Sequence, residues 1–188
     1  MDHFYMLPSF GEDWFTYKEM YSAMVKRFPS GSHFVEIGAW KGKSAAYMGV
    51  EIVNSGKNIR FDTVDTFQGS VEHQQNEVIL QKRLFDVFSE NIKPVAHVVN
   101  PVVSDSVAAA ASYADASLDF VFIDGDHSYE GVKKDIIAWL PKVKPGGIIA
   151  GHDYASWFPD TMRGIEECFP GKNVKSPWID DQSWLVQL

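Results

Sequence analysis

Short apolar runs alternate along this chain with longer segments in which apolar residues recur every three or four positions. The short runs predict buried β-strands at residues 33–37, 58–64, 95–99, 118–123 and 148–150. The longer pattern predicts helices at residues 13–28, 43–53, 104–113, 129–140 and 161–169. Proline and glycine separate these segments, as in the P-S-G run that begins at Pro29 and the K-P-G-G turn that begins at Lys144.

This alternation of strands and helices predicts an α/β, Rossmann-like, doubly wound and mostly parallel sheet with helices on both faces. Two last runs, residues 172–176 and 183–187, predict a C-terminal antiparallel hairpin. No internal repeat interrupts the pattern. We therefore expect residues 1–188 to form a single domain, with residues 1–30 supplying its N-terminal helix.

Residues 71–92 are long, polar and helical in pattern. They lie where a compact α/β unit needs only a short connection. We therefore expect this segment to be a helical insertion that covers a site as a lid.

Charge and cysteine content narrow the range of partners and locations. The formal net charge of -8 argues against nucleic acid as the main partner, because phosphate contacts require a basic surface. Cys168 has no second cysteine to pair with, and the first ten residues lack the basic and apolar pattern of a signal peptide. No apolar stretch is long enough to span a membrane. We expect a cytoplasmic protein without a membrane partner.

The first candidate site is a glycine turn after the first predicted strand, with the sequence E-I-G-A-W-K-G-K-S from Glu36. Ligands of doubly wound sheets bind at the carboxyl ends of the strands, where this turn lies. Trp40 and Ala45 break the dinucleotide fingerprint G-x-G-x-x-G, so the pyrophosphate cradle is missing. The turn suits S-adenosylmethionine (SAM), which has no phosphate, although a plain strand-to-helix turn has the same pattern.

The second candidate is Asp65, which ends the second predicted strand 27 residues after Gly38. A carboxylate at this place can accept both hydroxyls of a ribose. The alternative is a turn or capping residue beside Thr66. Together, the glycine turn and Asp65 favour an adenosine-type cofactor.

The third candidate combines polar residues that follow the fourth and fifth predicted strands: Asp124, Asp126, His127, His152 and Asp153. Carboxylates and imidazoles at neighbouring strand ends can bind a divalent cation or act as a general base. The alternative for Asp126 is to cap the helix that follows, a role that Ser128 can also fill. For His127 we expect an ordinary hydrogen-bonded neighbour without a chemical role.

These motifs resemble class I SAM-dependent methyltransferases. The resemblance covers residues 34–154 and is narrowest with a small family that carries F-I-D-G-D-H-S-Y-E-G-V, then L-P-x-x-x-P-G-G, then G-H-D-Y. More distantly, the chain is similar to metal-dependent O-methyltransferases that modify sugars. The resemblance implies cofactor contacts in chain order: Glu36, Gly38 and Gly42 at the methionine part, Asp65 at the ribose, Ser104 and Asp105 at the adenine, and Asp124 at the methionine end.

The resemblance also implies the chemistry of the acceptor end. Asp124 and Asp153 match metal ligands of the sugar-modifying relatives, and Asp126 matches their base. His152 stands where those relatives have an acid. It is therefore either a softer metal ligand or a base, so magnesium, manganese, zinc and no metal all remain open.

The expected function is transfer of a methyl group from SAM to a hydroxyl of a small molecule or sugar. Asp126 or His152 would remove the proton, and Trp157 with Phe158 would line the acceptor pocket. Two alternatives stay open: an NAD-type oxidoreductase on the same fold, and a non-catalytic interaction module that binds SAM without turnover.

Overall fold

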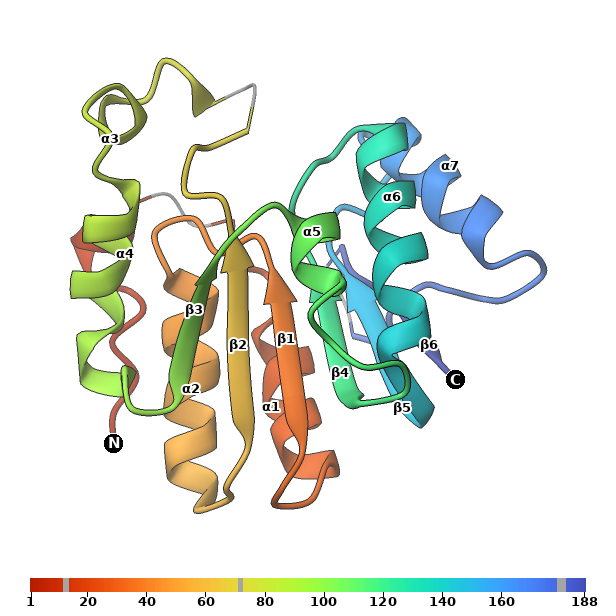
Figure 1. The fold of residues 1–188 in the computed structure, drawn as a ribbon, viewed down its shortest axis with the longest axis horizontal. Coiled ribbons are helices and arrows are strands. Elements are labelled where there is room, and N and C mark those ends of the chain that lie inside the picture. Colours follow the sequence, from red (N-terminus) through yellow and green to blue (C-terminus); the bar gives the residue numbers. More distant parts are fainter. Residues whose placement is uncertain (12–13, 71–72, 179–181) are drawn as a thin grey trace.

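The computed structural model describes residues 1–11, 14–70, 73–178 and 182–188. Its centre is a six-stranded sheet in the order β3-β2-β1-β4-β5-β6 (Figure 1). The strands are β1 (His33–Ile37), β2 (Arg60–Asp65), β3 (Val99–Val103), β4 (Leu118–Ile123), β5 (Val143–Gly151) and β6 (Trp184–Gln187). The first five pair in parallel and β6 pairs antiparallel with β5, which confirms the predicted fold class.

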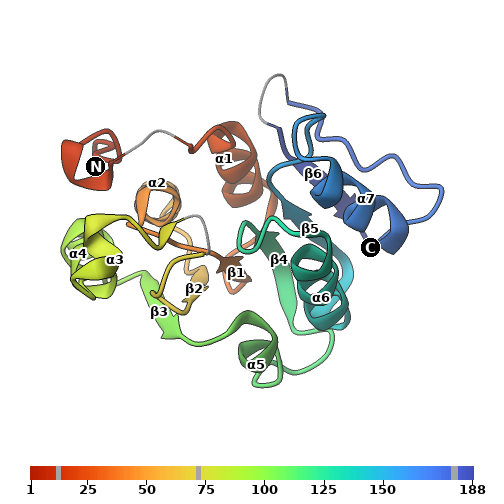
Figure 2. The ribbon, with the colours of Figure 1, turned by 90° about the horizontal axis from the view of Figure 1, so that it is seen from above.

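Helices cover both faces of this sheet (Figure 2). One face carries α1 (Lys18–Arg27), α2 (Lys43–Ser55) and α4 (Leu84–Ile92), and the other carries α5 (Ser106–Ala110), α6 (Tyr129–Trp139) and α7 (Pro159–Cys168). Each layer buries its own apolar cluster against the sheet. β1 and β4 are almost fully buried because both of their faces are covered.

The strand order reverses between β1 and β4, and the register there aligns three strand ends. Ile37 lies opposite both Val64 of β2 and Ile123 of β4. The next residue after each of these three is therefore at the same level of the sheet. Ligands of doubly wound sheets bind at such a reversal point.

The first helix and the third strand differ from the prediction. α1 begins at Lys18, and residues 14–17 before it have no regular secondary structure. Residue 13 of the predicted helix lies outside the described part. The third strand lies at Val99–Val103 rather than 95–99, because Lys93–Val95 forms a 3₁₀ turn started by Pro94. Pro101 is accommodated because β3 is an edge strand, where a missing N–H does no harm.

The segment predicted as one insertion contains two helices, α3 (Glu77–Leu80) and α4. Three α4 side chains belong to the core: Leu84, Phe88 and Ile92. α4 therefore supports the sheet as an ordinary crossover helix. Residues 71–72 lie outside the described part, and a lid role for the remainder stays a prediction.

The C-terminal chain forms an antiparallel pair with β5. The predicted hairpin partner of β6 is only a short bridge, at which Lys175 pairs with Trp184. The predicted turn at residues 144–147 is absorbed into β5, which begins at Val143. In the described part of the chain, no helix has the length and apolar character needed to cross a bilayer.

Candidate active site

A cavity of about 1140 Å³ lies at the carboxyl ends of the strands. Such a volume holds a ligand of SAM's size together with a second small molecule. Its lining includes most residues predicted from the sequence: Gly38, Asp65, Ser104, Asp105, Asp124, Asp126, His152 and Asp153. Two predicted cofactor residues, Glu36 and Gly42, are outside this lining and support it from behind.

Gly38 is required by the reversal point itself. Its φ is +85°, and a Cβ there would lie 1.9 Å from the backbone oxygen of Asp124. Any side chain would separate the β1 and β4 loops. Gly42 has a different role: at φ +87° it starts α2, and a Cβ would lie 2.9 Å from Phe88 and from Ile92 of α4.

Glu36 is fully buried beneath the cavity. The Tyr21 hydroxyl donates a hydrogen bond to its carboxyl at 2.7 Å, which ties α1 to β1. Burial raises the pKa of Glu36 to about 8, against the opposing effect of hydrogen bonds from Ser44 and Tyr21. Its carboxyl group is therefore mostly protonated at neutral pH and acts in packing.

Asp65 holds the glycine turn in shape. Its Oδ2 accepts hydrogen bonds from the backbone N–H of Ala39 at 2.8 Å and of Trp40 at 2.9 Å. Its Oδ1 accepts from the N–H of Phe67 at 2.7 Å. A carboxylate has about four acceptor positions, so capacity for a ribose hydroxyl remains on the cavity side.

The loop after β3 also lines the cavity, through Ser104 and Asp105. The Ser104 N–H donates to the backbone oxygen of Asp65 at 3.0 Å, which joins this loop to β2. Asp105 caps α5 by accepting from the N–H of Ala108 at 3.0 Å. Both residues line the cavity, and Asp105 also has this structural role.

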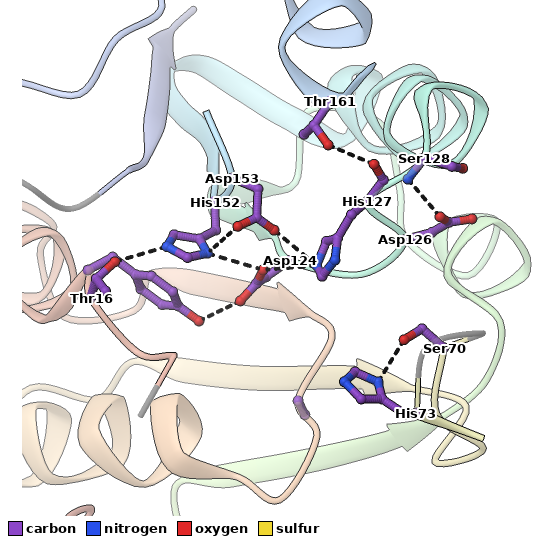
Figure 3. Close-up of polar contacts among 12 residues, drawn as sticks. Thr16, Ser70, His73, Asp124, Asp126, His127, Ser128, His152, Asp153 and Thr161 are labelled. Atoms are coloured by element: carbon purple, nitrogen blue, oxygen red, sulfur yellow. Dashed lines mark hydrogen bonds and ion pairs between the residues drawn. The ribbon is translucent and has the colours of Figure 1, made fainter. Parts of the chain in front are cut away.

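Three of the predicted polar residues that follow β4 and β5, namely Asp124, His152 and Asp153, form one cluster (Figure 3). Ile123 pairs with Gly151, so the residues that follow them, Asp124 and His152, emerge side by side. Asp124, His152 and Asp153 have ligand atoms within 4.8 Å of one another. His152 Nδ1 lies 3.1 Å from Asp153 Oδ1 and 3.7 Å from Asp124 Oδ1.

His127, expected from the sequence to be a hydrogen-bonded neighbour, contacts two carboxylates of the cluster. Its Nε2 lies 3.0 Å from Asp153 Oδ2 and 3.8 Å from Asp124 Oδ1 (Figure 3). Asp153 therefore contacts both histidines. The only local signal for this role was its position three residues after Asp124, in the same loop.

Asp126 points away from the cluster, toward the start of α6 (Figure 3). Its Oδ1 accepts from the N–H of Ser128 at 2.9 Å. Ser128 in turn caps α6 by accepting from the N–H of Gly131 at 3.1 Å. The predicted base thus lines the cavity but lies beside the cluster in this arrangement.

Residues 14–17, which precede α1, supply two contacts that no local motif indicated. The Tyr17 hydroxyl donates to Asp124 Oδ2 at 2.8 Å. Thr16 Oγ1 lies 2.9 Å from His152 Nε2. This contact occupies Nε2 and leaves Nδ1 of His152 facing the two carboxylates.

The charges within the cluster stabilise one another. Burial alone would raise the pKa of Asp124, but the hydrogen bond from His127, the two imidazolium charges and the Tyr17 hydroxyl outweigh it and lower that pKa. Burial alone would lower the pKa of His152, but Asp124 and Asp153 outweigh it and raise that pKa. A bound cation would take over this balancing role from the protons.

The donor set of the cluster fits a divalent cation. Asp124 and Asp153 offer carboxylate oxygens, and His152 offers Nδ1 while its other nitrogen is held by Thr16. Metal-binding histidines in proteins usually have their second nitrogen hydrogen-bonded in this way. A mixed nitrogen and oxygen set suits manganese, iron or zinc better than magnesium.

A reversal point lined by a glycine turn, an acid after β2 and a polar cluster after β4 and β5 is the place where doubly wound folds bind ligands. Residues 35–154 match the family model of a methyltransferase domain. The chain belongs to this methyltransferase-domain family.

Two relatives in sequence are known as uncharacterized proteins. R132 of Acanthamoeba polyphaga mimivirus is 24% identical over 136 residues, which are 71% of this chain and 58% of that protein. y4gI of Sinorhizobium fredii is 41% identical over 39 residues, which are 21% of this chain and 4% of that protein. The chain thus spans less than two thirds of the length of either relative.

Solved structures show the same fold at low identity. The O-methyltransferase NovP has a TM-score of 0.67 at 16% identity, over 92% of this chain and 79% of its own. CalS11, a TDP-rhamnose 3′-O-methyltransferase, has a TM-score of 0.58 at 16% identity, and the match covers 90% of this chain and 76% of CalS11. Aeropyrum pernix fibrillarin, solved with natively bound SAM, has a TM-score of 0.55 at 12% identity, and the match covers 93% of this chain and 76% of fibrillarin.

Proposed function

We propose that this protein transfers a methyl group from SAM to a hydroxyl oxygen of a small molecule, with a divalent cation bound at the polar cluster. One observation carries the proposal: the cluster of Asp124, His152 and Asp153 opens into the same cavity as Gly38 and Asp65. Neighbours of similar fold include two named O-methyltransferases, which supports the oxygen as acceptor atom.

The cofactor end follows the roles that the resemblance implies. Asp65 would accept the ribose hydroxyls, Ser104 and Asp105 would flank the adenine, and the turn at Gly38 would lie against the methionine part. Glu36 and Gly42 would act indirectly, through the packing of β1 and α2.

At the acceptor end, Asp124, Asp153 and His152 would hold the cation. When bound, SAM supplies an electrophilic methyl group and the cation lowers the pKa of the acceptor hydroxyl. The enzyme's own residues then orient the hydroxyl in line with the methyl group and remove its proton. His127 is better placed than Asp126 to take this proton, because its ring faces the cluster and Asp126 faces Ser128.

Cofactor binding is the first test. SAM and S-adenosylhomocysteine should raise the melting temperature, because they bind only the folded state. A rise in melting temperature with NAD and none with SAM would overturn the proposal in favour of an oxidoreductase.

The reaction itself is tested with SAM labelled in its methyl group. Mass spectrometry of the products should place the label on an oxygen atom of the acceptor.

The cation and the base need separate tests. Turnover should stop in excess chelator and return with manganese or magnesium. Full activity in excess chelator would show that the reaction needs no cation.

His127→Ala should lower kcat by 10²–10⁴-fold, the range of acid–base catalysis, and should still bind the cation, whereas Asp126→Asn should keep most of the activity. The reverse result would return the base to Asp126.

A further inference from the structure

The acceptor end of the cavity carries an exposed aromatic wall. Trp157 and Phe158 follow the cluster residue Asp153 at the start of α7, and both line the cavity. Trp157 is 65% exposed, although it lies beside a buried polar cluster. Phe158 packs its ring 5.9 Å from that of His127. Exposed indole at a cavity wall is a surface on which a flat ring can stack.

The cavity as a whole is acidic. Among the described residues that line it, seven carry carboxylates: Asp65, Asp105, Asp124, Asp126, Glu130, Asp135 and Asp153. If Asp124 and Asp153 balance a divalent cation, the other five carboxylates still outnumber the two lysines of the lining, Lys43 and Lys134. A negatively charged acceptor would be repelled there.

The two lysines of the described lining belong to α2 and α6. Lys43 starts α2 beside the glycine turn. Lys134 is one helical turn beyond Glu130, and its neighbour Asp135 has a hydrogen bond with Ser106, the first residue of α5. The nearby Arg163 stacks on the Tyr129 ring at 4.0 Å and is outside the lining. The part of the described lining that comes from β5 to α7, which carries the aromatic wall, therefore contains no lysine or arginine.

We infer that the methyl acceptor is an uncharged hydroxylated ring that stacks on Trp157 and presents a hydroxyl to the cluster, and that acceptors with a phosphate or carboxylate are rejected. This inference rests on the proposed function. It names a substrate class and the features that select it: Trp157 by stacking, and the carboxylates of the cavity lining, Glu130 among them, by charge.

Binding to protein saturated with S-adenosylhomocysteine tests the inference with two matched pairs of probes. Phenyl β-glucoside and phenyl β-glucuronide differ only in a carboxylate, as do catechol and 3,4-dihydroxybenzoate. The first pair represents sugar rings and the second aryl rings. By calorimetry, the uncharged member of at least one pair should bind roughly tenfold or more tightly than its anionic partner, since like charges disfavour the latter.

Variants connect the preference to the two features. Trp157→Ala should weaken binding of the uncharged probe roughly tenfold. Trp157→Phe should bind that probe with most of the wild-type affinity, because a stacking face remains. Glu130→Gln should narrow the gap between neutral and anionic probes. The affinity for S-adenosylhomocysteine should be unchanged in all three variants, which also shows that they are folded.

Each failure has a distinct meaning. If the wild-type protein does not bind S-adenosylhomocysteine, the proposed function itself fails. If it binds the cofactor product but prefers the anionic probes, binds none of the four, or is indifferent to Trp157→Ala, only the inference about the acceptor is overturned.

Discussion

At the scale of single residues, the same chemical group has different roles because its surroundings differ. Asp65 accepts three backbone N–H groups and lines the cavity. Glu36 is a buried acid whose pKa is raised to about 8. Asp62 is equally buried, yet hydrogen bonds and the charge of His33 outweigh burial and lower its pKa to about 2.

Asp65→Ala should weaken SAM binding, because a hydrogen bond to a charged group typically contributes about 1.5–3 kcal/mol. The variant also loosens the glycine turn, so a ligand lacking the ribose 2′-hydroxyl is needed as a control. Wild-type protein should prefer S-adenosylhomocysteine over its 2′-deoxy analogue, and Asp65→Ala should not distinguish them. An unchanged preference in the variant would show that Asp65 only positions the turn.

Asp62→Asn should destabilise the fold by about 2 kcal/mol at pH 7, which corresponds to the shift of the pKa from 3.8 to about 2. A lowered carboxyl pKa stabilises the folded state above the ordinary value, and this contribution disappears as pH falls through the folded value. Urea unfolding at pH 7, 5, 4 and 3 should therefore show the difference between wild type and variant shrinking below pH 4. A difference that is constant with pH would contradict the role of the charge.

At the scale of elements, the segment before α1 connects parts of the molecule that are far apart in the sequence. Thr16 and Tyr17 contact His152 and Asp124, which are more than a hundred positions away in the chain. The segment lies against the residues that follow β4 and β5, and α1 begins directly after it at Lys18. Its two hydroxyls orient the cluster without belonging to it.

Thr16→Val should weaken cation binding at the cluster by 10- to 100-fold, the usual effect of losing a hydrogen bond behind a metal ligand. Thr16→Ser keeps the hydroxyl and should bind as wild type does. Titration with manganese, followed by electron paramagnetic resonance, measures the affinity directly. Equal affinity in the valine and serine variants would mean that His152 does not depend on Thr16.

At the scale of the whole molecule, strand order decides where function can reside. The reversal between β1 and β4 places the cavity at the carboxyl ends of the strands, and an apolar cluster packs on each face of the sheet. The net charge of -8 is a property of the whole molecule as well.

That charge predicts a lack of salt-sensitive binding to nucleic acid, because few phosphates could be neutralised by this surface. Fluorescence anisotropy with labelled duplex DNA and with single-stranded RNA at 50 mM and 200 mM salt checks this expectation. Tight binding at low salt that falls steeply at high salt would favour a nucleic-acid acceptor over a small molecule.

Local pattern was enough for much of the fold and for the positions of the glycine turn and Asp65. Apolar runs identified four of the parallel strands, because a strand buried on both faces must be apolar along its length. The glycine turn and Asp65 lie next to their strands in the chain, so their positions followed from the strands themselves. The third strand was misplaced because Val95 is apolar for another reason: it is fully buried within the core cluster as part of a turn.

The sequence predicted that Asp124, His152 and Asp153 would lie at neighbouring strand ends, but only the tertiary structure decided how they meet and which further residues contact them. The pairing of Ile123 with Gly151 brings Asp124 to His152, and the path of the N-terminal segment brings Thr16 and Tyr17 to both. Such contacts join residues distant in sequence, so no periodicity or local motif records them. The orientations of Asp126 and His127 were equally undetermined, because a carboxylate beside a helix start can cap it or face the site, and the packing of α6 selects between these.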